Sequence, residues 1–175
     1  MKVKTPQGYR FVKELGGAIR RSSLSKTAST LLLQQIFGRK NELLTGRILD
    51  YGCGFGFDAD QLGWEAYDPY YRQKRPDGLF DSIVCNMVAN MLTRKSSLKL
   101  YDELDRMLCP QGKAFVSVSR NIPERGKAGI RQRIQNYVVL TLPSVFCDKE
   151  IEIYRLDKGA AFEDLTKEFL DAGNC

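Results

Sequence analysis

Hydrophobic residues in the middle of the chain alternate between strand-like runs and helix-like periods. Two helices are predicted, a short one over residues 57–62 and an amphipathic one over residues 96–108. The strand-like runs are short and apolar, and cover residues 47–51, 64–68, 80–87 and 113–119. Because strands and helices alternate at this pitch, the pattern predicts an α/β protein with a doubly wound, mostly parallel sheet.

The last third of the chain has a different pattern. Residues 137–146 and 150–156 are two β-rich runs joined by a three-residue link, which favours an antiparallel hairpin. Residues 161–173 are expected to form a final helix that ends at Gly173. A turn is predicted at residues 109–112, where Pro and Gly separate the amphipathic helix from the next strand.

The N-terminal part is polar and basic. Residues 1–24 contain Pro6 and a Gly-Gly pair, and we expect them to form an irregular basic arm. Ser25 can cap a helix that continues to about residue 38. Because 175 residues suit one hydrophobic core, residues 25–175 are predicted to form a single domain.

Composition excludes several kinds of site. The chain has no histidine, which rules out Ser–His and Cys–His nucleophile pairs and histidine metal ligands. Its five cysteines include no CxxC pair, so we expect reduced core thiols and no metal site. The N-terminus lacks the apolar stretch of a signal peptide, and no apolar run approaches the ~20 residues of a membrane span. We therefore expect a cytoplasmic protein without membrane contact.

The formal net charge of +6 is distributed unevenly. Residues 1–47 carry +8, residues 48–109 carry −3 and residues 110–175 carry +1. A second basic cluster, at residues 113–133, holds six Lys and Arg against Glu124. Such clusters attract nucleic acid or other anions, although a charged run is often only a solvated face.

The most informative window is ILDYGCGFGFDADQLGWEAYD. Its first strand contains Asp50 and runs into Gly52, Gly54 and Gly56, and a second acidic residue, Asp68, ends the next strand. Glycine lets the backbone turn sharply and approach a ligand closely. Because ligands bind outside the carboxyl ends of the strands in open α/β sheets, these residues are predicted to form one site, with Asp68 on ribose hydroxyls.

Several nucleotide ligands compete for this loop. The dinucleotide fingerprint GxGxxG would need glycine at position 57, where Phe57 stands, and the Gly-Lys-Ser/Thr of a P-loop is absent. An acidic residue two positions before the first glycine suits a ligand that carries a cation. This favours S-adenosylmethionine (SAM), with a nucleotide-binding oxidoreductase as a less favoured possibility.

The sequence resembles the class I SAM-dependent methyltransferases. The matching pieces are LDYGCGFG, AYDP, FDSIVCNMVANML and LDRMLCPQGKAFVSVS, which come in family order over residues 46–120. The hairpin at residues 137–156 fits the antiparallel sixth and seventh strands of that family. Residues 18–92, with AIRRSSLSKTAST, DYGCGFGFDADQL and YDPYY, also resemble the putative methyltransferases associated with DNA phosphorothioation operons.

The resemblance implies a Rossmann-like fold and a SAM site. The residues that it assigns to the cofactor are Asp50, Gly52, Cys53, Gly54, Gly56, Asp68, Pro69 and Asn86. The family's third strand does not fit into the eleven residues between Asp68 and Phe80, so it is expected to be reduced or absent. Recognition of adenine would then fall to Asp77 or Leu79, or to stacking on Tyr70 or Tyr71.

Candidate residues for catalysis and substrate binding are fewer. Asn86 would lie beside the transferred methyl group and could orient a nucleophile, or it could simply cap the backbone. Substrate contacts are predicted for Tyr70, Tyr71, Arg120 and Arg125, each of which could instead be an ordinary surface residue. The position that holds an Asn/Asp-Pro-Pro-aromatic motif or a Pro-Cys nucleophile in two classes of nucleic-acid methyltransferase has neither.

The sequence therefore predicts methyl transfer from SAM to an unidentified acceptor. Nucleic acid or another anionic substrate is compatible with the basic clusters. The alternative is a non-catalytic module that binds SAM or nucleic acid on the same fold, because a fold does not guarantee chemistry.

Overall fold

The computed structural model describes residues 2–5, 8–11, 43–128 and 134–167 of the chain. In the N-terminal part, β1 (Lys2–Thr5) and β2 (Gly8–Phe11) pair as an antiparallel hairpin. The sequence had predicted an irregular arm there. The rest of that arm, and the helix predicted from Ser25, lie outside the described residues.

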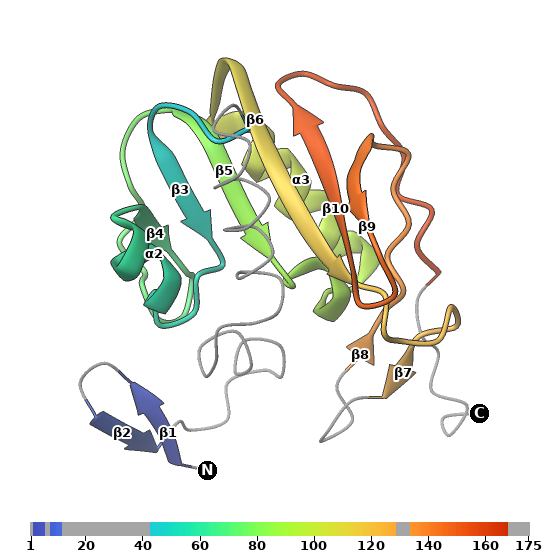
Figure 1. Cartoon of the computed structure of the whole chain (residues 1–175), viewed down its shortest axis with the longest axis horizontal. Helices are drawn as coiled ribbons and strands as arrows, with labels where there is room; N and C mark the ends of the chain where they lie inside the picture. Colours follow the sequence, from blue (N-terminus) through green and yellow to red (C-terminus); the bar gives the residue numbers. More distant parts are fainter. Residues whose placement is uncertain (1, 6–7, 12–42, 129–133, 168–175) are drawn as a thin grey trace.

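Six strands form the main sheet, in the order β4-β3-β5-β6-β10-β9 (Figure 1). They are β3 (Ile48–Tyr51), β4 (Glu65–Tyr67), β5 (Phe80–Asn86), β6 (Leu108–Ser119), β9 (Ser144–Cys147) and β10 (Ile151–Asp157). β4, β3, β5 and β6 run parallel, and β10 pairs antiparallel with both β6 and β9. The predicted mostly parallel sheet with an antiparallel C-terminal hairpin is confirmed.

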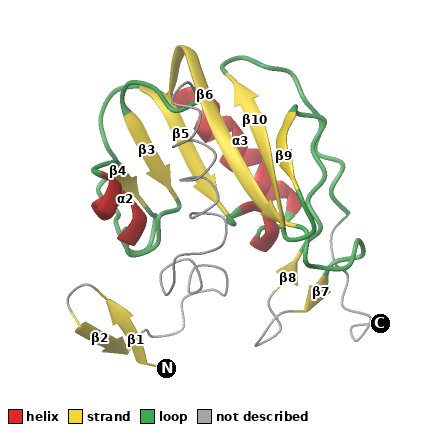
Figure 2. Ribbon diagram, viewed as in Figure 1, coloured by secondary structure: helices red, strands yellow, loops and turns green. Residues whose placement is uncertain are grey.

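The helices connect the parallel strands. α2 (Phe57–Leu62) follows β3, and α3 (Arg94–Met107) connects β5 to β6 and packs on the rear face of the sheet (Figure 2). The short 3-10 helix η2 (Ala89–Met91) precedes α3, and Thr93 caps α3 by accepting a hydrogen bond from the Ser96 N–H. A small separate pair, β7 (Lys127–Ala128) and β8 (Ile134–Gln135), completes the described elements.

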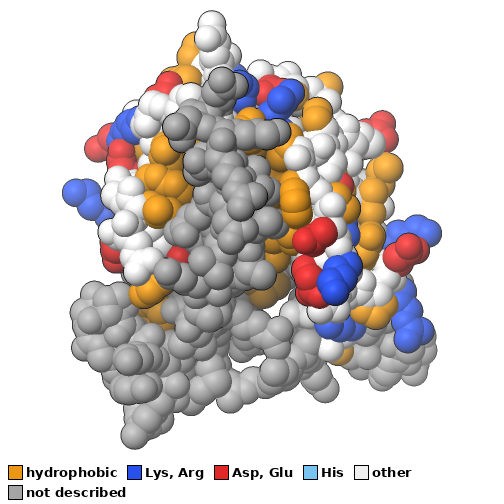
Figure 3. All heavy atoms as spheres, in the orientation of Figure 1, with side chains coloured by type: hydrophobic (Ala, Val, Ile, Leu, Met, Phe, Trp, Pro, Cys, Tyr) orange, Lys and Arg blue, Asp and Glu red, His pale blue; other side chains and the backbone are white. Residues whose placement is uncertain are grey.

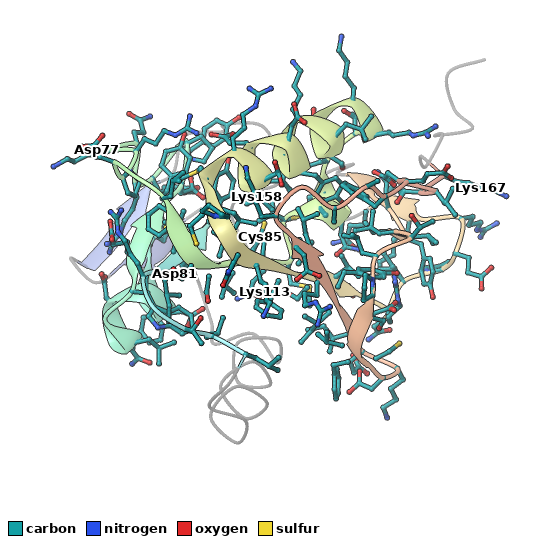
Figure 4. All side chains as sticks on the ribbon, turned by 90° about the horizontal axis from the view of Figure 1, so that it is seen from above. Asp77, Asp81, Cys85, Lys113, Lys158 and Lys167 are labelled. Carbon is teal, nitrogen blue, oxygen red and sulfur yellow. The ribbon has the colours of Figure 1, made fainter. Side chains whose placement is uncertain are left out.

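The central strands are apolar on both faces, as buried parallel strands require. On β5, Cys85 belongs to the cluster packed under α3, where Figure 4 labels it between helix and sheet, whereas the adjacent Val84 belongs to a second cluster. That second cluster also contains Phe115 and Ile153, and the partly buried Trp64 packs against it. In the view of Figure 3, some hydrophobic side chains of the described residues are visible at the surface among charged and polar ones.

The predicted loss of the third strand agrees with the structure. Residues 69–79 contain no helix or strand, so β4 is an edge strand of the sheet. Arg47 connects residues 69–79 to the sheet, because its guanidinium pairs with Glu65 and donates a hydrogen bond of 2.6 Å to the Asp77 carbonyl. The connection from β4 to β5 thus crosses β3 without an added strand.

Two C-terminal predictions are wrong in the described region. Of the β-rich run at residues 137–146 only its end is in β9, and residues 161–167 do not form the predicted helix. The two segments pair with each other instead, since the Leu165 N–H donates to the Val139 carbonyl at 2.8 Å and the Thr141 N–H donates to the Glu163 carbonyl at 3.0 Å. Long-range backbone pairing therefore overrides the helical pattern of the tail.

The predicted turn at residues 109–112 lies within β6. The register of the pair jumps there, with Phe80 opposite Leu108 but Ser82 opposite Lys113, so the turn residues bulge out of the ladder. The cysteines also differ from expectation: Cys53 and Cys85 are buried, but Cys109 is half-buried and Cys147 is exposed. Among the described residues, no helix has the length and apolar character needed to cross a membrane.

Arg120, predicted as a substrate contact, lies in a buried cluster at the end of β6. Its side chain is only 7% exposed and pairs with Glu152, while it donates to the Val138 carbonyl at 2.8 Å and to the Tyr154 hydroxyl at 2.7 Å. Burial opposes ionisation of Glu152, but hydrogen bonds from Ser144 and Arg120 keep its pKa below the usual value. This position gives no support to a substrate contact.

Replacing Arg120 by Met is expected to lower the free energy of unfolding by about 3 kcal/mol, because it leaves the Glu152 carboxylate buried without its cation. Urea unfolding followed by circular dichroism would measure this. The matched control Arg155→Met removes a partly exposed arginine of β10, and should cost less than about 1 kcal/mol. Equal effects of the two substitutions would contradict a structural role of the Arg120 cluster.

Candidate functional site

Three segments meet at the carboxyl edge of the parallel strands: the glycine loop after β3, the end of β4 and the segment after β5. The Gly52 N–H donates to the Tyr67 carbonyl at 2.8 Å. A Cβ on Gly52 would lie 2.5 Å from Cγ2 of Val88, and its φ of +75° also favours glycine. Glycine at this position therefore lets the first and third of these segments touch.

The second half of the glycine loop packs against Arg72. Gly56 caps α2 in the left-handed conformation, and a Cβ there would collide with the Arg72 guanidinium. That guanidinium donates to the Phe55 carbonyl at 3.0 Å and forms an ion pair with Asp60. Sequence reasoning missed Arg72, since no spacing pattern links it to partners twelve and seventeen residues away.

Asp68 connects the glycine loop to the turn after β4. Its carboxylate is 2% exposed and accepts three backbone hydrogen bonds, from Gly54 at 3.0 Å, Tyr70 at 2.8 Å and Tyr71 at 3.0 Å. Burial raises the pKa of Asp68, and these three N–H donors oppose that rise. Pro69 begins the turn, as is common where an Asp side chain closes it. Ribose binding by Asp68 stays a prediction, since the structure shows the carboxylate engaged with the backbone.

Asp50 is the other buried carboxyl of the site. It lies on β3, is 4% exposed, and its side chain makes no hydrogen bond within the described part of the chain. Burial, followed by the nearby charges of Asp58 and Asp68, raises the pKa of Asp50 to about 8. A cationic ligand beside it would favour the ionised carboxylate and supply the missing hydrogen bond.

The thiol and metal chemistry of the site is limited. Cys53 is buried within the glycine loop, and its Sγ lies 3.6 Å from the Gly54 carbonyl oxygen. Burial, with Asp50 nearby, raises the pKa of the Cys53 thiol, which makes it a poor nucleophile. In the residues that the structure describes, no three Cys, Asp or Glu side chains lie together as a metal site would need.

Asn86 ends β5 at the same edge of the sheet. Its side-chain oxygen accepts a hydrogen bond of 2.8 Å from the buried Ser117 hydroxyl. The next residue, Met87, has a φ of +56°, which is uncommon outside glycine, and its N–H donates to the Ser117 carbonyl. The strand end is thus held in a defined conformation with the Asn86 amide oriented by β6.

An aromatic hollow borders the glycine loop on the β4 side. Phe55 and Tyr71 contact each other with ring centroids 4.3 Å apart, and both line this hollow together with Tyr70. The candidate adenine residues Asp77 and Leu79 are exposed on the same segment, and Figure 4 labels Asp77 at this end of the sheet. The two tyrosines therefore line the same hollow as Phe55 of the glycine loop.

The remaining candidates lie on the other side of the site. Arg125 is exposed in the loop between β6 and β7, and part of the basic cluster around it is not described.

Sequence reasoning overlooked Asn90, whose buried amide accepts from the Ser119 N–H at 2.8 Å and donates to the Asn136 carbonyl at 2.8 Å. Asn90 thereby joins η2 to the end of β6, a long-range contact without a sequence signal.

No protein-family model matches the chain, and no curated protein matches it in sequence. Solved structures are similar in fold. The PH0226 protein from Pyrococcus horikoshii OT3 has a TM-score of 0.52 at 12% identity, covering 82% of this chain and 96% of that one. The 1,6-didemethyltoxoflavin-N1-methyltransferase of Burkholderia thailandensis, solved with S-adenosylhomocysteine, has a TM-score of 0.50 at 14% identity, covering 75% of this chain and 77% of that one.

A third similar structure is the N-methyltransferase NodS from Bradyrhizobium japonicum WM9 in complex with S-adenosylhomocysteine. It aligns with a TM-score of 0.44 at 15% identity, over 75% of this chain and 85% of that one. At these identities the likeness concerns the fold alone. The likeness to the first two structures, together with the strand order, shows that the chain has the Rossmann-like fold found in class I methyltransferases.

Proposed function

We propose that the chain is a SAM-dependent methyltransferase that binds its cofactor at the carboxyl edge of β3, β4 and β5. The observation that carries this proposal is Asp50, a buried carboxyl without a hydrogen-bond partner among the described residues, next to the glycine loop. SAM has an ammonium group and a sulfonium, and a buried carboxylate compensates such charges well.

The residues of the site fit SAM in kind. Asp50 would face the positive charge, while the main chain at Gly52, Cys53 and Gly54 would allow close approach of the ligand. Phe55 and Tyr71 offer an aromatic wall for the adenine ring, with Tyr70, Asp77 and Leu79 as the other candidates that the sequence leaves open. When bound, SAM would supply an activated methyl group on sulfur.

The chain's own contribution to the chemistry would be positioning. The Asn86 amide, held by Ser117, could orient an acceptor at the strand end. Proximity and orientation can lower a barrier substantially without proton transfer, so the absence of histidine does not oppose this activity. An acceptor that is already a good nucleophile would need no general base.

Isothermal titration calorimetry with SAM, S-adenosylhomocysteine and NAD would test the cofactor. We expect both sulfur compounds to bind and NAD to fail. Transfer of labelled methyl from SAM to pools of RNA, DNA and small molecules would then test the activity. Binding without transfer to any pool would leave a non-catalytic SAM-binding module, and tight NAD binding alone would overturn the proposal.

Replacing Gly54 by Asp is expected to weaken SAM binding at least 100-fold, because it adds a side chain and a negative charge beside Asp68. Calorimetry would measure the loss. Gly63→Asp is the matched control, because Gly63 has a similar left-handed φ of +70° and open space around its Cα. Unchanged affinity of the Gly54 variant, or equal loss in both variants, would contradict the site.

The raised pKa of Asp50, at about 8, predicts that SAM affinity depends on pH. If only the ionised carboxylate binds the cation, affinity should rise about tenfold per pH unit below pH 8. Calorimetry between pH 6 and 7.5 would measure the slope. Asp50→Asn should bind weakly with no slope over this range, and a wild-type protein without a slope would contradict the role of Asp50.

The same pKa has an opposite effect on the ligand-free protein. The folded state keeps its proton on Asp50 up to about pH 8, whereas an unfolded Asp releases it near 3.8. The contribution of this residue to stability therefore falls as pH rises between these two values. Thermal unfolding of wild type and Asp50→Asn should diverge with rising pH, with the variant becoming relatively more stable.

A further inference from the structure

Beside the open edge of β4 lies a hollow whose inner wall, Phe55 and Tyr71, is the proposed adenine contact, and whose outer side at Lys74 and Arg75 is assigned to no cofactor contact. It is bounded by β4 on one side and by the strandless residues 69–79 on the other. Its lining includes Phe55, Tyr70, Tyr71, Lys74 and Arg75. Because no further strand pairs with β4 in the described chain, this space is open to solvent beside the glycine loop.

The charges in the hollow differ in their availability. Arg47 and Arg72 are engaged by Glu65 and Asp60, respectively. Lys74 is exposed and forms no ion pair with a described residue, whereas Arg75 pairs with Glu103 at 3.1 Å through Nη1 but keeps 53% of its side chain exposed. The outer rim therefore presents one unpaired cation, Lys74, beside the paired but more exposed Arg75, with Asp77 as an acid further along.

The aromatic side chains of the hollow come from segments with a defined backbone position. Tyr70 is 45% exposed, yet its backbone is fixed by the hydrogen bond from its N–H to Asp68. Tyr71 faces inward against Phe55. An exposed aromatic ring on a fixed backbone, followed within five residues by two exposed cations, combines a stacking surface with phosphate-binding charge.

We propose that this hollow binds single-stranded nucleic acid, with a base on Tyr70 and backbone phosphates at Lys74 and Arg75. Single strands offer both unstacked bases and closely spaced phosphates, whereas a duplex hides its base faces and an acidic peptide has no large planar ring. The sequence had favoured the basic cluster at residues 113–133 for contact with an anion. Arg120 of that cluster is held in an ion pair with Glu152.

The position of the hollow suggests what the strand does there. β4 and β5 are separated by β3, so Asn86 lies about 10 Å from the β4 edge. The hollow would hold nucleotides that flank the acceptor and not the acceptor itself. The binding site stands without the proposed methyl transfer, and only its role in presenting an acceptor rests on it.

Fluorescence anisotropy with labelled single-stranded RNA and DNA of about 12 nucleotides would test this inference. The 175-residue chain should bind single strands. It should bind the matching duplex and a poly-glutamate peptide at least tenfold more weakly. Saturating S-adenosylhomocysteine should not displace the oligonucleotide. Displacement would mean that the oligonucleotide only occupies the cofactor site.

Three variants make the test specific. Tyr70→Ala should weaken binding about tenfold through lost stacking, and Tyr70→Phe should retain it. Lys74→Gln with Arg75→Gln should reduce the salt slope of binding by about 1.4, the share of two phosphate contacts. Lys149→Gln with Arg155→Gln removes the same charge near the opposite sheet edge and should change the slope little.

The inference is overturned if single strands do not bind, if Tyr70→Ala binds like wild type, or if both charge variants behave alike. Circular dichroism of each variant would show whether it is folded, and a misfolded Tyr70→Ala leaves the Lys74 and Arg75 pair as the deciding comparison. Calorimetry with SAM separates the two proposals. Oligonucleotide binding without SAM binding would retain the hollow and reject the methyltransferase.

Discussion

The carboxylate of Asp68 is the group on which the geometry of the candidate site depends. It accepts hydrogen bonds from the loop after β3 and from the turn after β4, so two segments fourteen residues apart share one buried anchor. A buried carboxylate is costly unless its oxygens are paired, and here three backbone donors meet this need. The same contacts hold the glycine loop beside the end of β4 and leave Tyr70 exposed on a fixed backbone.

The short connection from β4 to β5 determines the shape of that edge. Since residues 69–79 add no strand, two arginine side chains hold the segment in place. Arg47 pairs with Glu65 and donates a hydrogen bond to the Asp77 carbonyl, and Arg72 packs against Gly56. The result is a hollow lined by aromatic and basic side chains beside the proposed cofactor loop. The missing strand thus leaves the edge of β4 open beside this hollow.

Much of this architecture could be predicted from the sequence. The glycine loop, α2, α3 and the parallel strands follow from local apolar runs and turn residues, and the eleven-residue link correctly predicts the missing strand. The errors have a common cause. Residues 161–167 have a helical pattern but pair with residues 139–141. Arginine is usually exposed, but the side chain of Arg120 lies in a buried ion pair. Both depend on partners far away in the sequence.

The sequence by itself determined the fold class, the parallel strands as elements and the acidic and glycine residues of the candidate site, because these depend on local periodicity and on backbone conformations that favour glycine. Only the tertiary structure decided how those residues are used. It turned Asp68 toward backbone donors, left Asp50 buried without a hydrogen bond to the described chain, and set Arg72 against the loop. Such outcomes depend on burial and long-range hydrogen bonding, which no local pattern records.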